Sequence, residues 1–282
     1  MEIKKVGVVG CGMMGSGIAI LSAQAGYPTT VSEVNDDLLN KGLASIDKFL
    51  VNGVEKDRIS QQDKDGTIAR IKGTTDMKDF HDCDLVIEAA VENLDLKKKI
   101  FTNLDQVCQE RAILATNTSG LSVIDISTAT KRPDKILGLH FFNPPQIMKL
   151  LEIVRTIAVS DETMETCRQF GNSIGKTIVM VKDTPAFVVN ALLVPYLLNA
   201  IRMFDAGIAT KEDIDTAAKA GLNYPMGPLT LCDHVGLDTL LFLSDATYEQ
   251  LKDPQWAAPT ILRKMVAAGW YGRKSGKGFY EY

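Results

Sequence analysis

Six residues near the start of the chain restrict its fold more than any other segment does. Residues 10–15 read GCGMMG, which fits the pattern G-x-G-x-x-G, and they continue the β-branched run KVGVV. A stretch of helical spacing rich in Ala, Ile and Leu comes next, ends before Gly26, and is followed by the β-rich run PTTVSEV. Strand, glycine turn, helix and strand in this order predict a βαβ unit that binds a dinucleotide pyrophosphate at the helix N-terminus. The alternative is a tight turn that binds no ligand.

Each glycine of the motif has its own physical reason. The first allows the tight turn, the second lets a pyrophosphate approach the backbone, and the third lets the helix pack closely on the strand. The predicted cofactor-binding residues of this turn are Gly10, Gly12, Met13, Met14 and Gly15. Glu33 closes the second strand, where a carboxylate accepts hydrogen bonds from ribose hydroxyls and repels a 2′-phosphate. No Arg follows it directly, so the sequence predicts NAD and not NADP as the cofactor.

The same glycines argue against a membrane-spanning helix over residues 6–32, a stretch without charged side chains. Glycine costs ~1 kcal/mol relative to alanine in a helix. Over the whole 282-residue chain, 45% of the residues are hydrophobic and 23% are charged, as is usual for soluble globular proteins. The net charge of −4 leaves no dense basic surface for a nucleic acid. We therefore expect a soluble protein that binds neither membrane nor nucleic acid.

The cysteines indicate the redox compartment. The chain has 5 of them, an odd number, with no C-x-x-C pair and no ligand spacing with a histidine. This pattern fits neither a disulfide framework nor a zinc site, so we expect no metal. Reduced thiols are typical of the cytoplasm, which is the location that we predict.

Strand and helix patterns continue to alternate through the first two thirds of the chain. The predicted strands after the βαβ unit are 84–90, 112–119, 135–142, 148–156 and 177–183, and the predicted helices are 36–50, 61–71, 93–108, 122–128 and 161–174. Regular alternation is typical of a doubly wound, mostly parallel α/β sheet of the Rossmann type. We therefore predict an NAD-binding Rossmann-like domain over residues 1–184.

The pattern changes after residue 184. Thr184 followed by Pro185 predicts the start of a helix, and residues 186–201 carry no charge. These 16 residues are too few to span a bilayer, and Pro195 should kink the helix, so we interpret it as buried at a domain or subunit interface. Further helical patterns start at Lys211 and near residues 229 and 259. Residues 185–282 are thus predicted to form a small all-helical domain for substrate binding and dimerisation.

A histidine and a glutamate are candidates for acid–base chemistry. His140 ends a predicted strand, where doubly wound sheets place their ligands. Glu152 is the only acid in the apolar run LLEIV, where an unpaired carboxylate would be costly to bury. A hairpin centred near Gln146 would set the two residues opposite each other, and the carboxylate would then fix the tautomer of a general base. The alternative is a purely structural pair.

Other polar residues could line the same edge of the sheet. Ser119 ends a predicted strand, and its hydroxyl could bind a substrate oxygen or simply cap a turn. Asn190 is an amide within an apolar helix and must find a partner, which could be a neighbouring helix. Residues 97–99, all lysine, and residues 273–277 are typical of solvated faces, although they or Lys48 and Lys56 could serve a phosphate-rich ligand.

With these motifs the chain resembles the 3-hydroxyacyl-CoA dehydrogenase family, and within it the bacterial 3-hydroxybutyryl-CoA dehydrogenases, over essentially its whole length. The matching stretches are VGVVGCGMMGSGIA, DLVIEAAVEN, ATNTS, KRPDKILGLHFFNPP, MKLLEIV, FVVNALL, NYPMGP and GRKSGKGFYEY. The resemblance implies His140 as catalytic base, Glu152 as its partner, and Ser119 and Asn190 around the substrate. It also implies Glu92, Lys97, Asn117, Ser119, Asn143 and Lys274 near the nicotinamide nucleotide, and Ser119, Lys56 and Lys48 toward CoA.

The reaction implied by the resemblance is the reversible oxidation of an (S)-3-hydroxyacyl-CoA by NAD⁺, with short-chain acyl-CoA substrates and a homodimer as further expectations. Glu33, Gly120 and Ala191 depart from the usual pattern of the family, in which Asp, Ser and Arg are common. Two alternatives remain: a dehydrogenase of another 3-hydroxy acid or of a longer acyl-CoA, and a non-catalytic NAD-binding protein of the same fold.

Overall fold

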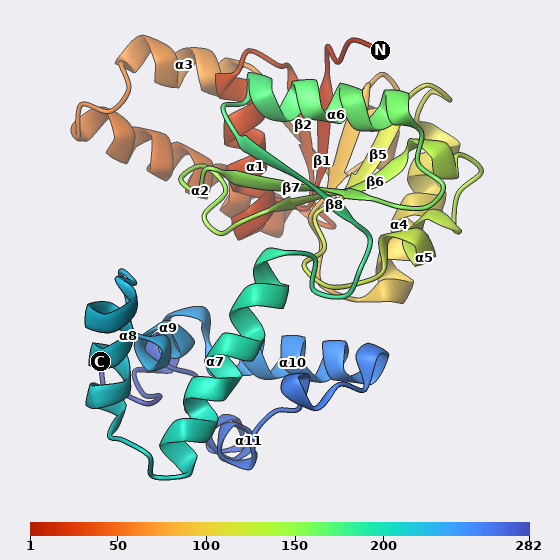
Figure 1. The fold of residues 1–282 in the computed structure, drawn as a ribbon. Helices are drawn as coiled ribbons and strands as arrows, with labels where there is room; N and C mark the ends of the chain where they lie inside the picture. Colours follow the sequence, from red (N-terminus) through yellow and green to blue (C-terminus); the bar gives the residue numbers. More distant parts are fainter. The chain divides into compact units, whose positions relative to one another are not determined.

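An eight-stranded sheet with the strand order β3-β2-β1-β4-β5-β6-β7-β8 forms the centre of the first part of the chain (Figure 1). The computed structural model describes residues 1–282 and contains two compact units, Met1–Thr184 and Pro185–Tyr282. The strands are β1 Val6–Val9, β2 Thr29–Ser32, β3 Ile71–Thr74, β4 Leu85–Glu88, β5 Ile113–Thr116, β6 Ile136–Phe141, β7 Leu150–Arg155 and β8 Thr177–Lys182. The first six are parallel, and β7 runs antiparallel to β6, so the predicted doubly wound, mostly parallel sheet is confirmed.

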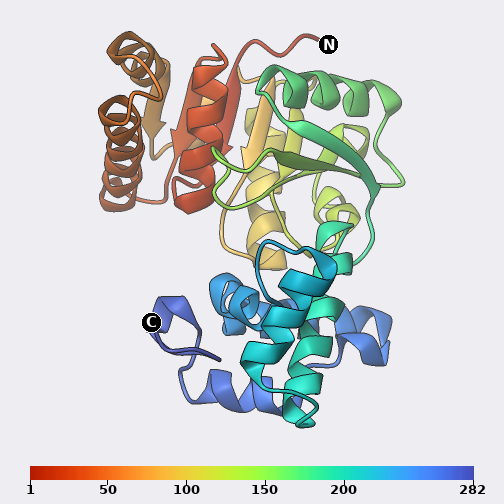
Figure 2. The same cartoon turned by 60° about the vertical axis from the view of Figure 1, so that its left-hand side comes forward.

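Helices cover both faces of this sheet. The helices are α1 Met13–Gln24, α2 Asp36–Glu55, α3 Gln61–Ala69, α4 Leu94–Val107, α5 Val123–Ser127 and α6 Asp161–Ser173, with single 3₁₀ turns at Met77–Phe80 and Pro133–Lys135. Ile18 of α1 and Phe170 of α6 belong to one hydrophobic core, and Phe101 of α4 and Ile126 of α5 belong to the other. Figure 2 shows α2 and α3 as a pair beside α1. The two cores arise because each helix buries one apolar stripe against the sheet.

The strand order reverses between β1 and β4. β1 pairs with β2 on one side and with β4 on the other, and Val9 lies level with Glu88 at the carboxyl ends of these two strands. In open α/β sheets, ligands bind at the carboxyl edge beside such a reversal. The turn after β1 and the residues that follow β4 and β5 therefore define the candidate site.

One strand was missed by the sequence prediction. Residues 61–71 were expected to be helical, but α3 ends at Ala69 and Ile71–Thr74 form β3, the edge strand beside β2. Its sequence, IKGT, has no apolar alternation and contains a glycine, both of which disfavour a strand prediction. The strand exists because its backbone pairs with β2, a contact made outside the local sequence.

The second unit is helical, as predicted, and contains no named strand. Its helices are α7 Val189–Asp205, α8 Lys211–Leu222, α9 Pro228–Val235, α10 Leu237–Leu251 and α11 Thr260–Ala267, with 3₁₀ turns at Pro254–Trp256 and Arg273–Ser275. Leu197, Leu229 and Leu240 are among the side chains of its separate hydrophobic core. No helix in either unit has the length and apolar character needed to cross a bilayer.

The start of α7 differs from the prediction. Thr184 does not cap the helix, which begins at Val189 and has no side-chain N-cap. Ala186 and Phe187 lie in a turn with φ angles of 66° and 52°, a left-handed conformation that interrupts any helix begun at Pro185. The helix then continues through Pro195 to Asp205 without ending at the proline.

Candidate active site

The glycine turn after β1 has the shape of an anion-binding loop. Gly10 has a φ of +95°, which favours glycine, and a Cβ atom added at Gly15 would lie 1.8 Å from the carbonyl oxygen of Gly10. A Cβ at Gly12 would meet nothing within 4 Å, so the space above it is open. Gly12 is the N-cap of α1 and provides no side-chain hydrogen bond, and the first turn of α1 has no acid. The helix N-terminus is thus open to a phosphate group, and the residues fit a pyrophosphate.

Glu33 follows β2 and lies beside this turn. Its Oε1 accepts a hydrogen bond of 2.8 Å from the backbone N–H of Cys11, and its Oε2 accepts one of 3.2 Å from Val34. The first of these contacts holds a carboxylate next to the glycine turn, at the position where a ribose would lie in this fold. Met13 is exposed at the start of α1, whereas Met14 packs against the core of the unit.

His140 and Glu152 form a buried pair. The two residues are direct partners in the antiparallel ladder of β6 and β7, so the predicted placement across a hairpin is confirmed. His140 Nδ1 lies 2.7 Å from Glu152 Oε2. The exposed fractions are 5% for His140 and 0% for Glu152. Because a carboxylate accepts, Nδ1 carries the hydrogen and Nε2 is the basic nitrogen of the ring.

A second buried cluster lies where β4 and β5 end. Lys97 of α4 is 1% exposed, and its Nζ lies 2.6 Å from Glu88 Oε1 and 3.3 Å from Glu92 Oε2. Glu92 Oε1 accepts hydrogen bonds from the Ser119 N–H at 2.9 Å and from the Ser119 hydroxyl at 3.5 Å. The Thr118 hydroxyl also donates to Glu92. The structure therefore connects Lys97, Glu92 and Ser119, which the resemblance places near the nucleotide.

One prediction about this cluster needs correction, and one of its residues was not predicted. Residues 97–99 were interpreted as a solvated face, but Lys97 is buried because two carboxylates surround its ammonium group. Glu88 was not predicted as a site residue, although it is fully buried at the end of β4. The signal that drew attention to Glu152 applies to it equally: Glu88 is the lone acid within the apolar run LVIEAAV.

Of the two predicted asparagines, Asn117 connects neighbouring strand ends. Asn117 follows β5, and its Oδ1 accepts a hydrogen bond of 2.9 Å from the backbone N–H of Phe141, the residue after His140. Asn143 is exposed in the loop after β6. Asn117 thus fixes the end of β6 relative to β5.

The two lysines expected near CoA differ in their surroundings. Lys56 is the C-cap residue of α2 and lines a cavity of about 550 Å³. Its other lining residues are Gln24, Phe49, Asn52, Gly53, Arg58, Ile59, Gln146 and Ile147. Lys48 is exposed in the middle of α2 and does not line this cavity. Arg58, which the sequence prediction did not include, adds a second positive charge beside Lys56.

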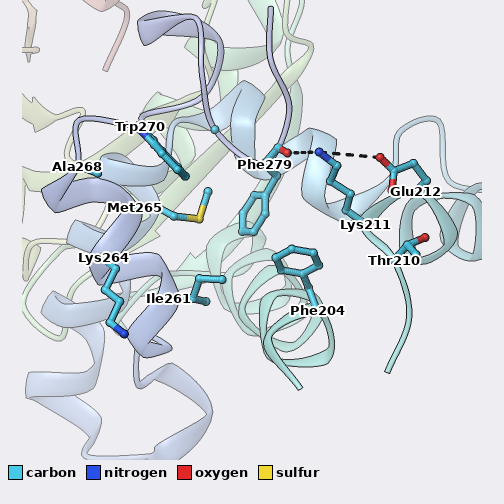
Figure 3. A pocket seen from close by; sticks show the side chains of 11 residues that line it. Phe204, Thr210, Lys211, Glu212, Ile261, Lys264, Met265, Ala268, Trp270 and Phe279 are labelled. Carbon is cyan, nitrogen blue, oxygen red and sulfur yellow. Dashed lines mark hydrogen bonds and ion pairs between the residues drawn. The ribbon is translucent and has the colours of Figure 1, made fainter. Parts of the chain in front are cut away.

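The second unit carries two of the predicted site residues. Asn190 is buried near the start of α7, and Lys274 forms an ion pair with Asp238 of α10. A pocket of about 610 Å³ in this unit contains neither of them; Phe204, Met265, Trp270 and Phe279 give it an apolar wall (Figure 3). This pocket is therefore separate from the predicted site residues of the second unit.

Comparisons with known proteins agree along the whole chain. The family model for the NAD binding domain of 3-hydroxyacyl-CoA dehydrogenase matches residues 5–184, and the model for the C-terminal domain matches residues 187–282. The chain is 46% identical to a 3-hydroxybutyryl-CoA dehydrogenase of Mycobacterium tuberculosis, with 99% of each chain covered. It is 42% identical to the mitochondrial hydroxyacyl-coenzyme A dehydrogenase of Sus scrofa, covering 99% of this chain and 91% of the relative.

A solved structure gives the same result. The crystal structure of (S)-3-hydroxybutyryl-CoA dehydrogenase from Ralstonia eutropha aligns with a TM-score of 0.97 at 40% identity, covering 100% of this chain and 99% of that one. The first family model covers the glycine turn and the second covers the helical unit, and the relatives and the solved structure cover both. The chain therefore belongs to the 3-hydroxyacyl-CoA dehydrogenase family and is an oxidoreductase with an NAD-binding domain.

Proposed function

We propose that the protein catalyses the reversible reaction of an (S)-3-hydroxyacyl-CoA and NAD⁺ to a 3-oxoacyl-CoA and NADH. Short-chain esters, 3-hydroxybutyryl-CoA and acetoacetyl-CoA, are its proposed substrates. The observation that carries the proposal is the contact of 2.7 Å between His140 Nδ1 and Glu152 Oε2 at the carboxyl end of β6. The names of the relatives from Mycobacterium tuberculosis and Ralstonia eutropha support the choice of substrate.

His140 is the proposed general acid and base. In the oxidative direction, Nε2 accepts the proton of the substrate's 3-hydroxyl group, and in reduction the imidazolium returns a proton to the C3 oxygen. Glu152 holds the ring through Nδ1 and stabilises the imidazolium with its negative charge. Because Glu152 is fully buried, little water competes for this interaction.

NAD is the proposed cofactor, bound at the glycine turn with Glu33 on the adenosine ribose. When bound, NAD⁺ supplies the hydride acceptor of the reaction. The backbone N–H groups at the start of α1 would hold the pyrophosphate, since Gly12 leaves that space open. The carboxylate of Glu33 would accept from the ribose hydroxyls and disfavour a 2′-phosphate. Proposed contacts of the nicotinamide half are Glu92, Asn117, Ser119, Asn143 and Lys274, with Lys97 acting through Glu92.

Ser119 and Asn190 are the proposed polar contacts of the acyl group. A hydroxyl and an amide can both donate to an oxygen, which suits the C3 oxygen and the thioester carbonyl of the substrate. The Glu92 carboxylate orients Ser119, because it accepts hydrogen bonds from the backbone N–H and the hydroxyl of Ser119. Lys56 is the proposed contact of the CoA phosphates, because it lines a cavity that Lys48 does not reach.

The two units have proposed roles that follow from these contacts. Residues 1–184 bind the cofactor, and residues 185–282 contribute to substrate binding and form a homodimer. Leu192, Leu222 and Phe242 are exposed apolar side chains of the second unit, which favours an interface there. Light scattering during gel filtration should therefore give twice the chain mass of 30.8 kDa.

The test of the function is NADH consumption, followed by absorbance, with acetoacetyl-CoA as substrate. Free acetoacetate and NADPH serve as controls. Rapid NADH loss with the thioester alone would support the reaction, the cofactor and the dependence on CoA together. Loss with free acetoacetate would indicate a dehydrogenase of a free hydroxy acid. A protein that binds NADH but turns over neither thioesters of any chain length nor free acids would be a non-catalytic member of the fold.

A further inference from the structure

Glu88 is a fully buried carboxylate beside the proposed site, and the mechanism above does not use it. Its exposed fraction is 0%, and its side chain accepts hydrogen bonds from α4, from β5 and from the backbone just after β4. Oε1 accepts from the Ala90 N–H at 2.7 Å and from Lys97 Nζ at 2.6 Å, and Oε2 accepts from the Thr116 hydroxyl at 2.7 Å. The side chain is therefore held on three sides, with the Lys97 ammonium as its charged partner.

Lys97 carries this constraint to Glu92. Its ammonium lies between the two carboxylates, 2.6 Å from Glu88 and 3.3 Å from Glu92. It also donates to the Ala90 carbonyl at 3.5 Å. The shorter contact is the one to Glu88, so Glu88 is the nearer anionic partner of the ammonium, which also contacts Glu92 Oε2. Glu92 Oε1 is left to accept from Ser119, 2.9 Å from its N–H.

The charges explain why the buried Lys97 ammonium needs a second carboxylate besides Glu92. Burying an ion is costly unless it is paired and hydrogen-bonded, and Lys97 is 1% exposed. Without Glu88, the ammonium would have Glu92 as its only ionic partner and would draw that carboxylate inward, away from Ser119. With Glu88 present, Glu92 keeps a 24% exposed side chain at the carboxyl edge of the sheet.

We propose that Glu88 is a positioning residue, which fixes the Lys97 ammonium and through it the Glu92 carboxylate that orients Ser119. This inference rests on the proposed function, because it assigns the cluster to the binding of cofactor and substrate. The competing explanation is that Glu88 only joins β4 to β5 through Thr116.

Asp84 provides a matched control for that explanation. It is also a buried carboxylate, and it immediately precedes β4, at the opposite end of the strand from Glu88. It accepts from the backbone N–H groups of Lys4 and Lys5 and from Arg111. Asp84→Asn therefore removes a buried charge beside the same strand without touching the Lys97 cluster.

The experiment compares Glu88→Gln, Glu92→Gln, the double variant and Asp84→Asn. Steady-state kinetics with acetoacetyl-CoA, the NADH dissociation constant from fluorescence, and the unfolding temperature are measured for each. Glu88→Gln is expected to lower kcat/KM about tenfold and to weaken NADH binding, while Asp84→Asn keeps both within about twofold even if it unfolds at a lower temperature. The double variant should lie within about threefold of Glu92→Gln, since coupled residues are not additive.

Three outcomes would overturn the inference: multiplicative effects in the double variant, normal kinetics and NADH affinity in Glu88→Gln, or equal losses in Asp84→Asn. If Glu88→Gln does not fold, Lys97→Gln removes the same ion pair by changing its other member. The inference then requires that Lys97→Gln lowers the affinity for NADH. A wild-type protein without turnover would contradict the proposed function instead. In that case the NADH affinities alone decide the role of Glu88.

Discussion

His140 and Glu152 face each other across two adjacent antiparallel strands, with Nδ1 of the histidine 2.7 Å from Oε2 of the glutamate. The ladder sets the separation of the two backbones, so the pair does not depend on a flexible loop for its geometry. The Phe142 ring, 4.5 Å from the imidazole centre, packs on the histidine. The imidazole is thus oriented by a carboxylate at one nitrogen and confined by an aromatic ring.

His140→Gln should abolish most of the turnover while NADH binding stays nearly intact. Glutamine cannot act as a general base near neutral pH, and general acid–base catalysis contributes ~10²-fold or more. The measurement is kcat with acetoacetyl-CoA beside an NADH titration followed by fluorescence. A variant with a near-native rate would remove His140 from the mechanism.

Glu152→Gln tests the charge of the pair separately from its shape. The amide can still accept a hydrogen bond from Nδ1, but it no longer stabilises the imidazolium, so we expect kcat to fall about tenfold. Because the site is fully buried, the free energy of unfolding should also fall, by about 1–3 kcal/mol. Chemical denaturation measures the second effect. A loss of stability with unchanged kcat would show that the pair is only structural.

Glu33→Ala should weaken the discrimination between NADH and NADPH. The carboxylate repels a 2′-phosphate, and removing it should raise the ratio of kcat/KM for NADPH over NADH by about tenfold. Asp37→Ala is the matched control, since Asp37 is an exposed acid in the first turn of α2. An unchanged ratio in Glu33→Ala, or an equal change in the control, would contradict the proposed ribose contact.

Lys56→Ala should raise the KM for acetoacetyl-CoA about tenfold with little change in kcat, because a lysine–phosphate contact contributes about 1.5–3 kcal/mol. Lys48→Ala is expected to leave both constants unchanged, since Lys48 is exposed and lies outside the cavity that Lys56 lines. Initial rates over a range of thioester concentrations separate the two constants. Equal effects of the two substitutions would indicate a diffuse electrostatic contribution and no specific site.

The cysteines should be unreactive in the native protein. All five are buried, and burial raises the pKa of Cys83 to about 12 and that of Cys108 to about 11. A raised pKa leaves less of the reactive thiolate at pH 8. Ellman's reagent should therefore detect free thiols only after denaturation, and one that reacts rapidly in the native state would contradict this. The free energy of unfolding should also decrease as the pH rises above about 8.5, where the unfolded thiols ionise.

Local patterns were enough for much of the fold. The glycine turn, the alternation of strands and helices, and the all-helical second unit follow from short-range periodicity and turn chemistry, and each is present in the structure. The opposition of His140 and Glu152 was also predictable, because an antiparallel pair joined by a short loop leaves few possible registers.

Contacts between distant segments decided the rest. β3 is a strand because β2 pairs with it, and its own residues do not favour one. Lys97 appears solvated in a run of lysines, yet it is buried because Glu88 and Glu92 converge on it from the end of β4 and the segment after it. Lys56 and Lys48 look alike in the sequence, and only the fold separates one that lines a cavity from one on an open helix face.

The sequence by itself determined most of the backbone plan of this protein and the opposition of His140 and Glu152, because periodicity and turns are local properties and a short hairpin leaves few registers. Only the tertiary structure decided which charges are buried and which of them meet. Burial depends on the elements that surround a side chain, and those elements come from parts of the chain that no local pattern relates.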